Sequence, residues 1–491
     1  MCGLIYVQIS TMRDKLERLQ QQASLLEPNE QERLKLRGAI VDETESFLNN
    51  LDDFEKLPTY FPNVNGKELM DFPISDESIG LQNAIRLVTD NIDKTGITGA
   101  SGGHLGYIPG GGVYSSSLGD YWTDVVNTYA GVFFASPGAV RMENHLINWM
   151  RDMVGYPAST YGNLASGGSI ANLIALVTAR DAFEIKSKDV EHHVIYLSKQ
   201  AHHCLHKAIH IAGLSDCPLR TIKLDDQFRL DADDLTRQIE KDKKQGLKPF
   251  FIVASAGTTD TGAIDPIDTM ADIAESNKAW FHVDAAYGGF FMLTAEGRKK
   301  FKGIDRSDSV VLDPHKGLFL PYGVGVVLVK EGELMRKAFS YFASYMQDIV
   351  VQQDEVSPAD VSPELTKPFR GLRMWLPLML HGLKPFKACL EEKLLLAKYA
   401  YEQLQNMEDV VVGPSPELSV VTFRFVPEGK DANTFNASVV KAIHEDGRIF
   451  ISSTTIDGVF TLRLAILSFR THLSTIDLTL KILNEKVEAL K

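Results

Sequence analysis

Short runs of mostly apolar residues recur between positions 140 and 330, and the stretches between them have helical patterning. The runs are VIYLS (194–198), FFIVASAG (250–257), WFHVDAA (280–286), SVVLD (309–313) and VGVVLVK (324–330). Runs of this length are typical of buried strands, and strands that alternate with helices form a mostly parallel sheet covered by helices. The middle of the chain is therefore predicted to have an α/β fold.

The two ends of the chain are patterned differently. The segment from Thr11 to Leu51 is rich in Glu, Gln, Lys, Arg and Leu and is interrupted at Pro28, which predicts two amphipathic helices. The glycine- and serine-rich segment from Gly96 to Gly119 is expected to be a loop. After a polar stretch, the remainder predicts helices at 383–407 and 433–445, strands at 420–425, 448–453 and 460–466, and a final helix.

We therefore expect three parts: an N-terminal helical domain (1–96), a large α/β domain (97–380) and a small α+β domain (381–491). A net charge of −13, from 51 basic and 64 acidic residues, disfavours nucleic acid and anionic membranes as partners. No apolar run approaches the ~20 residues of a membrane span. Four scattered cysteines and an N-terminus without a basic leader predict a cytoplasmic protein.

Residues capable of chemistry follow several of the predicted strands. His202 lies four residues after VIYLS, Asp284 ends WFHVD, and Lys316 follows SVVLD. Ligands of open parallel sheets bind outside the carboxyl ends of the strands, so these side chains are expected to meet there. A fourth segment, Ser166–Ser169, precedes a helical stretch whose N-terminus could bind a phosphate. The alternative for this segment is a plain helix start with Ser169 as the N-cap.

Lys316 and Asp284 are costly to bury unless each has a partner. A lysine at this position is expected to form an imine with a carbonyl cofactor, and an aspartate is the expected partner of a pyridinium nitrogen. The alternative for the pair is an internal salt bridge. His202, His206 and His210 could instead share a helix face as metal ligands, but no carboxylate or cysteine is suitably spaced, so no metal is expected.

These segments resemble the group II pyridoxal-phosphate-dependent amino-acid decarboxylases, the family of aromatic-L-amino-acid, tryptophan and glutamate decarboxylases. The resemblance covers nearly the whole chain. It rests on SGGSIANL (166–173), SKQAHHCLHKA (198–208), AGTTDTGAIDP (256–266), FHVDAAYGG (281–289), DPHKG (313–317) and LTKPFRGLRMW (365–375). It implies the aspartate-aminotransferase-like fold (PLP fold type I), a homodimer with each site at the subunit interface, and pyridoxal 5′-phosphate as cofactor.

The resemblance also implies roles for individual residues. Lys316 corresponds to the cofactor lysine, Asp284 to the partner of the ring nitrogen, and His202 to the imidazole stacked over the ring, which could also deliver a proton. The implied phosphate neighbours are Gly168, Ser169, His315 and Asp313, and the residues that line the ring are Thr258 and Ala286. Asp313 stands where many relatives have asparagine, and its charge beside a phosphate is unfavourable unless it is solvated, protonated or turned away.

The implied reaction is loss of CO2 from an L-amino acid followed by protonation to the amine. Residues 345–370 resemble the family's mobile lid, but Met346 to Phe369 contains no tyrosine to reprotonate the product carbon. His202, Tyr341, Tyr345 or water would then have to donate. We expect the amine; the alternatives are an aldehyde synthase, in which the carbanion meets oxygen, and a cofactor-binding protein without turnover.

Residues 104–112 correspond to the family's substrate-side wall. Tyr107, Ile108 and Pro109 offer an apolar surface, and Gly110 to Gly112 leave room beside it. This stretch has no obvious basic side chain that could bind a second carboxylate of the substrate, so an aromatic substrate is expected over glutamate or aspartate. The alternative is another non-aromatic amino acid. Arg370 could bind a second carboxylate, but a hinge or interface anchor is the favoured role.

Overall fold

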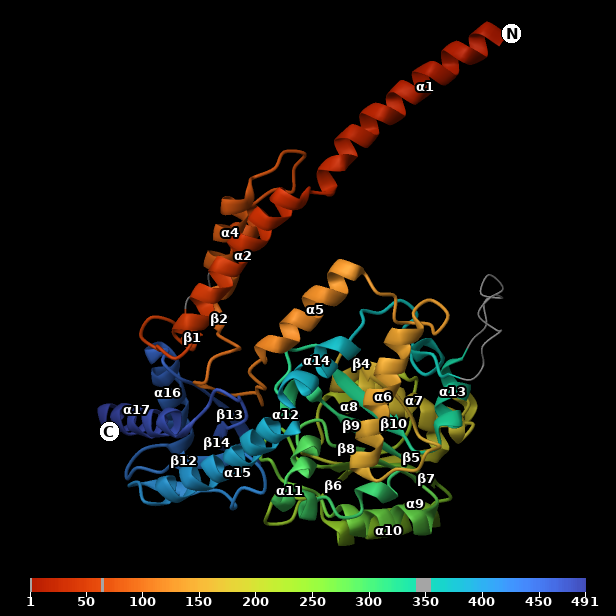
Figure 1. The fold of residues 1–491 in the computed structure, drawn as a ribbon. Coiled ribbons are helices and arrows are strands. Elements are labelled where there is room, and N and C mark those ends of the chain that lie inside the picture. The colour runs from red at the N-terminus through yellow and green to blue at the C-terminus, as the bar shows by residue number, and fades with distance from the viewer. Residues whose placement is uncertain (1, 63–65, 341–354) are drawn as a thin grey trace.

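The structure, a computed structural model, describes residues 2–62, 66–340 and 355–491, with side chains from residue 11 onward. It consists of a helical N-terminal arm, a large body built on a seven-stranded sheet, and a smaller body built on a five-stranded sheet (Figure 1). The predicted α/β class is confirmed.

The large sheet has the strand order β4-β10-β9-β8-β7-β5-β6. Its strands are β4 (Tyr161–Ala165), β5 (His193–Ser198), β6 (Leu219–Ile222), β7 (Lys248–Ser255), β8 (Trp280–Asp284), β9 (Ser309–Leu312) and β10 (Gly325–Val329). All neighbours are parallel except β10, which is antiparallel to β4 and β9. The connection from β9 to β10 holds only the four-residue helix Pro314–Gly317, whereas parallel neighbours are usually joined by a longer crossover helix. The five predicted strands are confirmed, whereas β4 and β6 were not predicted.

Helices cover both faces of this sheet, as the alternation along its buried strands requires. On β9, Val310 and Leu312 join one hydrophobic cluster and Val311 joins the other. The first cluster includes residues of α6 (Pro137–Val154), α9 (Ala232–Lys244), α10 (Ile267–Asn277), α14 (Gly371–His381) and α15 (Leu383–Gln405). The second includes residues of α7 (Gly168–Ala182), α8 (Cys204–Ile211) and α13 (Gly332–Phe339).

The smaller sheet has the order β11-β12-β14-β13-β3. Its C-terminal strands are β11 (Val410–Val412), β12 (Val420–Phe425), β13 (Phe450–Ile456) and β14 (Val459–Ala465), packed with α15, α16 (Ala432–Asp446) and α17 (Leu473–Leu490). These elements confirm the predicted helices and strands. Its edge strand β3 (His104–Leu105) comes from the glycine-rich segment and pairs in parallel with β13. A side chain at Gly103 or Gly106 would collide with Arg448 or Phe450, so the glycines permit this docking.

The expectation that residues 96–119 form a loop is wrong at its end, because α5 (Tyr114–Val126) begins inside that segment. The small residues of α5 pack against α14 rather than forming a loop. A Cβ atom at Gly119 would lie 2.8 Å from the carbonyl oxygen of Leu372. Small residues such as Gly119 allow α5 and α14 to pack closely. Glycine and serine are also common in loops, which is why the sequence suggested a loop.

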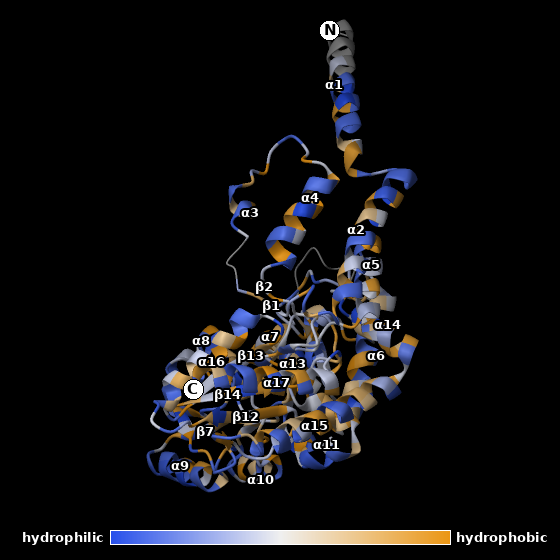
Figure 2. Cartoon of the chain, turned by 90° about the vertical axis from the view of Figure 1, so that its left-hand side faces the viewer, coloured by the Kyte–Doolittle hydropathy of each residue, from blue (hydrophilic) through white to orange (hydrophobic). Residues whose placement is uncertain are grey.

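The N-terminal arm contains the two helices expected there, α1 (Cys2–Ala23) and α2 (Glu30–Asn50). Asn29 and Glu32 form a reciprocal capping box at the start of α2. The arm leads to α3 (Glu68–Asp71), α4 (Leu81–Val88) and the short antiparallel pair β1 (Tyr60–Phe61) and β2 (Gly96–Ile97). The arm projects from the two bodies (Figure 1), and its helices carry both hydrophobic and hydrophilic residues (Figure 2). In the described part of the chain, no helix has the length and apolar character to cross a membrane.

Candidate active site

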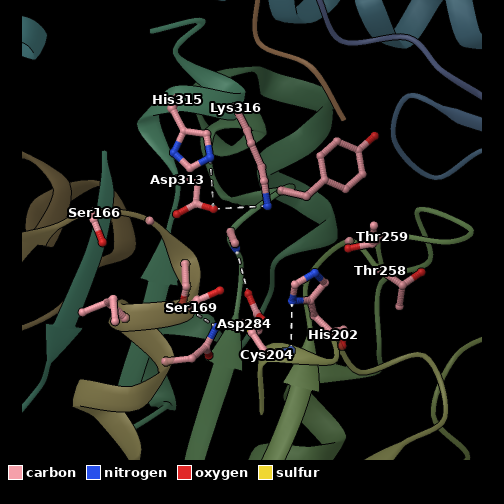
Figure 3. A pocket seen from close by; sticks show the side chains of 18 of the residues that line it. Ser166, Ser169, His202, Cys204, Thr258, Thr259, Asp284, Asp313, His315 and Lys316 are labelled. Atoms are coloured by element: carbon pink, nitrogen blue, oxygen red, sulfur yellow. Dashed lines mark hydrogen bonds and ion pairs between the residues drawn. The ribbon is translucent and has the colours of Figure 1, made fainter. Parts of the chain in front are cut away.

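A cavity of about 430 Å³ opens at the carboxyl ends of the parallel strands. Its lining comes from the segments that follow β4, β5, β7, β8 and β9 (Figure 3). For the segments after β5, β8 and β9, this agrees with the prediction from their place after a strand. The lining residues that carry ionisable side chains are His202, Cys204, Asp284, Tyr287, Asp313, His315, Lys316 and Tyr322. A pocket with so many convergent polar groups is suited to a small charged ligand.

Asp284 ends the buried strand β8 and is 8% exposed. Its Oδ1 accepts a hydrogen bond of 3.1 Å from the backbone N–H of Ala286, and its Oδ2 accepts one of 3.1 Å from Asn172. A carboxylate has about four lone-pair sites, so capacity remains for a donor in the cavity.

Lys316 lies in the short helix α12 (Pro314–Gly317), and its Nζ is 3.1 Å from Oδ2 of Asp313. Burial by itself lowers the pKa of Lys316, but the carboxylates of Asp313 and Asp284 oppose it, and the pKa is raised overall. The internal salt bridge considered for Lys316 thus exists, but with Asp313 rather than Asp284. The other oxygen of Asp313, Oδ1, is buried without a hydrogen-bond partner within the described residues.

His202 precedes α8 and lines the cavity. Its Nδ1 accepts a hydrogen bond of 3.3 Å from the backbone N–H of Cys204, which leaves the hydrogen of the neutral ring on Nε2. Burial lowers the pKa of His202, despite the nearby charge of Asp284. Because His202 lies outside the helix that carries His206 and His210, the three do not share one helix face. The described residues contain no group of three or more His, Cys, Asp or Glu side chains able to hold a metal ion.

The segment after β4 forms a tight turn into α7. The helix begins at Gly168, and its N-cap is Gly167, without a side-chain cap, so the alternative of Ser169 as N-cap is wrong. A Cβ atom at Gly168 would lie 2.9 Å from Oδ2 of Asp313, so a glycine keeps this corner open. His315 donates from Nδ1 to the carbonyl of Val324 at 2.5 Å, and burial lowers its pKa.

Thr258 and Ala286 also line the cavity. The Thr258 hydroxyl lies 2.8 Å from that of Thr261 and accepts a hydrogen bond from the backbone of Ala263, so its orientation is fixed. All of the expected cofactor neighbours therefore reach one cavity.

The substrate loop, residues 104–112, lies against the backbone of His315 and Lys316 at Gly110. Tyr107 and Ile108 have φ angles of 58° and 60°, an unfavourable left-handed conformation for side chains other than glycine. Tyr107 is 64% exposed with its ring 5.6 Å from that of Phe450, whereas Ile108 and Pro109 are buried. A Cβ atom at Gly110 would lie 2.3 Å from the carbonyl oxygen of His315. Within the described part of this single chain, residues 107–110 are not among those that line the cavity.

The expected lid is described only from residue 355 onward, and Tyr341 and Tyr345 lie outside the described residues. Arg370 is 6% exposed and already paired: it donates to Glu364 at 2.9 and 3.0 Å and to the carbonyl of Leu164 at 3.1 Å. These hydrogen bonds fit a structural anchor better than a residue that binds a substrate carboxylate. Lys367 beside it forms a buried ion pair of 2.6 Å with Glu143, which the sequence reasoning missed.

Asn172, Cys204, Gln200 and Tyr322 also line the cavity and were not predicted. Asn172 could have been found: it lies four residues after Gly168, on the same face of α7 as the glycine turn.

This chain is similar to several known proteins. The family model described as "Pyridoxal-dependent decarboxylase conserved domain" matches residues 66–426. An aromatic-L-amino-acid decarboxylase of Bacillus atrophaeus is 33% identical over 372 residues, which are 75% of this chain and 77% of the relative. A phenylacetaldehyde synthase of Arabidopsis thaliana is 28% identical over 90% of this chain and 93% of its own. The solved structure of Oryza sativa TDC with PLP and tryptamine has a TM-score of 0.88 at 22% identity, covering 94% of this chain and 99% of that one.

Proposed function

Since this chain belongs to the pyridoxal-dependent decarboxylase family, a family of PLP-dependent carboxy-lyases with fold type I, we propose that it removes the α-carboxylate of an aromatic L-amino acid as CO2 and releases the amine. The observation that carries the proposal is the convergence of Lys316, Asp284 and the N-terminus of α7 on one cavity. The overall reaction consumes one proton for each CO2 released.

The residues of the cavity fit pyridoxal 5′-phosphate. The glycine turn at the start of α7 provides an open corner at a helix N-terminus, where the helix dipole favours a phosphate. His315 and Ser169 line the same corner. Asp284 retains acceptor capacity for a ring N–H, and Lys316 is the amine that could bind an aldehyde. When bound, the cofactor supplies an electron sink for the pair left behind by the departing CO2.

We assign the following roles to the chain's own residues. Lys316 would hold the cofactor through its amine. The negative charge of Asp284, which acts strongly because it is buried, would favour a proton on the ring nitrogen. His202 would contact the ring and, once protonated, donate the proton to the product carbon. Thr258 and Ala286 enclose the ring.

The substrate class rests on Tyr107, the exposed aromatic residue of the apolar segment 107–109. Within the described residues, this segment does not line the cavity of a single chain, so we propose that Tyr107 faces the substrate at the subunit interface of the dimer. Arg370 supports the same class, because its guanidinium is already engaged by Glu364. An apolar wall without a free cation favours an aromatic side chain over an acidic one.

An aldehyde synthase is the second candidate. The segment Met346–Phe369 contains no tyrosine, and both decarboxylases and phenylacetaldehyde synthases are similar to this chain. In that reaction the amino acid, O2 and water would give the aldehyde, CO2, ammonia and hydrogen peroxide. The group that protonates the product carbon decides between the two products.

We also propose a cytoplasmic homodimer with the three-part division 1–96, 97–380 and 381–491. An apolar strip on α5 supports the dimer, because monomers rarely expose so much apolar surface. Its exposed residues are Tyr114, Leu118, Tyr121, Trp122, Val125 and Val126. The location is supported by three described cysteines that form no disulfide.

The test is a product assay combined with a covalent label. Purified enzyme is offered each common L-amino acid, and amine, aldehyde and peroxide are measured in parallel. Stoichiometric amine from an aromatic substrate is expected, whereas stoichiometric peroxide with little amine would establish the aldehyde synthase. Borohydride reduction followed by peptide mapping should place the cofactor on the DPHKG peptide, and a label on another lysine would overturn the assignment of Lys316.

A further inference from the structure

A line of buried polar side chains runs from Asp284 and Asn172, at the cavity, into the protein. Its members come from α7, β8 and β9, and each is at most 8% exposed. In order, they are Asp284, Asn172, His282, Ser309 and Trp280. A buried network of this kind is stable only when every donor finds an acceptor.

The hydrogen atoms in this line have one consistent arrangement, which can be worked out from both ends. At the far end, the indole N–H of Trp280 can only donate, and it does so to Oγ of Ser309 at 2.8 Å. At the near end, Nδ2 of Asn172 donates both of its hydrogens, to Oδ2 of Asp284 at 3.1 Å and to the carbonyl of Gly168 at 2.9 Å.

The amide oxygen of Asn172 therefore faces Nε2 of His282, at 2.7 Å, and can only accept. The hydrogen of His282 is then on Nε2, and Nδ1 accepts from the hydroxyl of Ser309 at 2.8 Å. Burial lowers the pKa of His282 to about 4, so the ring is neutral near pH 7. A neutral ring adds no second positive charge to compete for the carboxylate of Asp284.

We propose that Asn172 is a positioning residue that locks the Asp284 carboxylate to the phosphate-binding turn at Gly168, and that Nε2-protonated His282 holds the Asn172 amide in the orientation this requires. The inference rests on the proposed function, in which Asp284 faces the ring nitrogen. Asn172 thus couples the two ends of the cofactor site: one amide group fixes both the carboxylate for the ring and the turn for the phosphate.

The test compares two ligands that differ only at the ring nitrogen: pyridoxal 5′-phosphate and its analogue with carbon in place of that nitrogen. Dissociation constants are measured on wild type, Asn172→Leu, Ser309→Ala and Asp284→Asn. Asn172→Leu should weaken the cofactor about tenfold more than the analogue, because both ligands use the phosphate-binding turn but only the cofactor uses Asp284. Ser309→Ala, which removes the hydroxyl that contacts Nδ1 of His282, should shift the ratio in the same direction by a smaller factor.

Asn436→Leu is the matched control, since Asn436 is an equally buried asparagine that makes its hydrogen bonds within the small body. This variant should leave the ratio of the two constants unchanged. Equal weakening of both ligands by Asn172→Leu, or the same ratio change in the control, would overturn the role of Asn172. If Asp284→Asn itself leaves the preference for the ring nitrogen intact, the proposed function of Asp284 fails instead.

The tautomer provides an independent readout. In enzyme labelled with ¹⁵N-histidine, His282 should show a protonated Nε2 and an unprotonated Nδ1 at pH 6, and Ser309→Ala should alter that pattern. A ring protonated on both nitrogens at pH 6 would contradict the arrangement.

Discussion

Two regions of the molecule each contain a buried histidine in a different environment. One is the cofactor wall, formed by β8, β9 and the start of α7, and the other is the substrate loop, residues 104–112. On the cofactor wall, His282 has a hydrogen-bond partner on both ring nitrogens. In the substrate loop, His104 of β3 is 3% exposed, and neither of its ring nitrogens has a hydrogen-bond partner in the described part of the chain. The loop also holds Tyr107 and Ile108 in left-handed conformations.

The difference shows where the structure is rigid and where it is strained. The cofactor wall is anchored at strand ends of one sheet, where Asp284, Asn172 and His282 have fixed hydrogen-bond partners. The substrate loop is held by docking to β13 of the other sheet, and it tolerates an unsatisfied histidine and unfavourable φ angles. We therefore expect the reaction class to depend on the wall and the choice of substrate to depend on the loop.

The largest effect is expected from Asp284→Asn on the cofactor wall. The substitution nearly preserves shape but removes the charge that holds a proton on the ring nitrogen. Turnover should fall about a thousandfold, equivalent to about 4 kcal/mol in the barrier. Single-turnover decarboxylation measures this directly, and normal turnover in the variant would mean that Asp284 is a structural acid.

The two histidines are expected to differ in what they contribute to stability. For His282→Phe, Asn172 and Ser309 lose buried partners, so the free energy of unfolding at pH 7 should fall by about 2–3 kcal/mol. His104→Phe removes no hydrogen bond and keeps an aromatic contact with Phe450, so its change at pH 7 should be below about 1 kcal/mol. Urea unfolding measures both, and equal losses would remove the contrast between the two regions.

The pH dependence of stability tests the buried state of His104 separately. Burial lowers the pKa of His104 to about 4, against a smaller opposing effect of the backbone of Gly99. A neutral buried histidine stabilises the fold above its unfolded pKa of about 6.5, and that stability is lost as pH falls toward 4, by about 3 kcal/mol per histidine. His104→Phe should therefore flatten the loss of stability between pH 6.5 and 4. An unchanged acid profile would show that His104 is already protonated in the folded enzyme.

A smaller effect is expected from Asp313→Asn. The carboxylate of Asp313 helps to raise the pKa of Lys316, which keeps the amine protonated in the free enzyme and slows its reaction with an aldehyde. In the variant the pKa of Lys316 should fall, so cofactor loading at pH 7 should be about tenfold faster, because one pKa unit corresponds to a tenfold change in neutral amine. Loading is followed by absorbance from pH 6 to 9, and a profile that does not move toward lower pH would exclude this role.

The smallest effect is expected from Tyr107→Ala in the substrate loop. Loss of an exposed aromatic contact should raise KM for an aromatic substrate about fivefold, about 1 kcal/mol, and leave kcat nearly unchanged. Steady-state kinetics tests it. A large fall in kcat would mean that Tyr107 takes part in the reaction itself. It would contradict the view that the cofactor wall sets the reaction class and the substrate loop sets only the choice of substrate.

Much of the site could be predicted because its residues follow buried strands. Lys316, Asp284 and His202 stand out in the sequence because each follows or ends an apolar run. Burying a charged or polar group there costs free energy unless the group has a partner. The antiparallel direction of β10 could not be read in this way, because its apolar run looks the same in either direction. The helix α5 was missed because its small residues are equally typical of loops.

The sequence by itself determined the fold class, the family and the group of residues that meet at the strand ends, because periodicity and local motifs are properties of neighbouring residues. Only the tertiary structure decided which carboxylate pairs with Lys316, that Arg370 is engaged by Glu364, and that Asn172 joins Asp284 to His282. Asn172 lies 110 positions from His282 in the chain, and β3 pairs with a strand more than 340 positions away. Contacts at such separations are set by how whole sheets and helices pack, which no local pattern encodes.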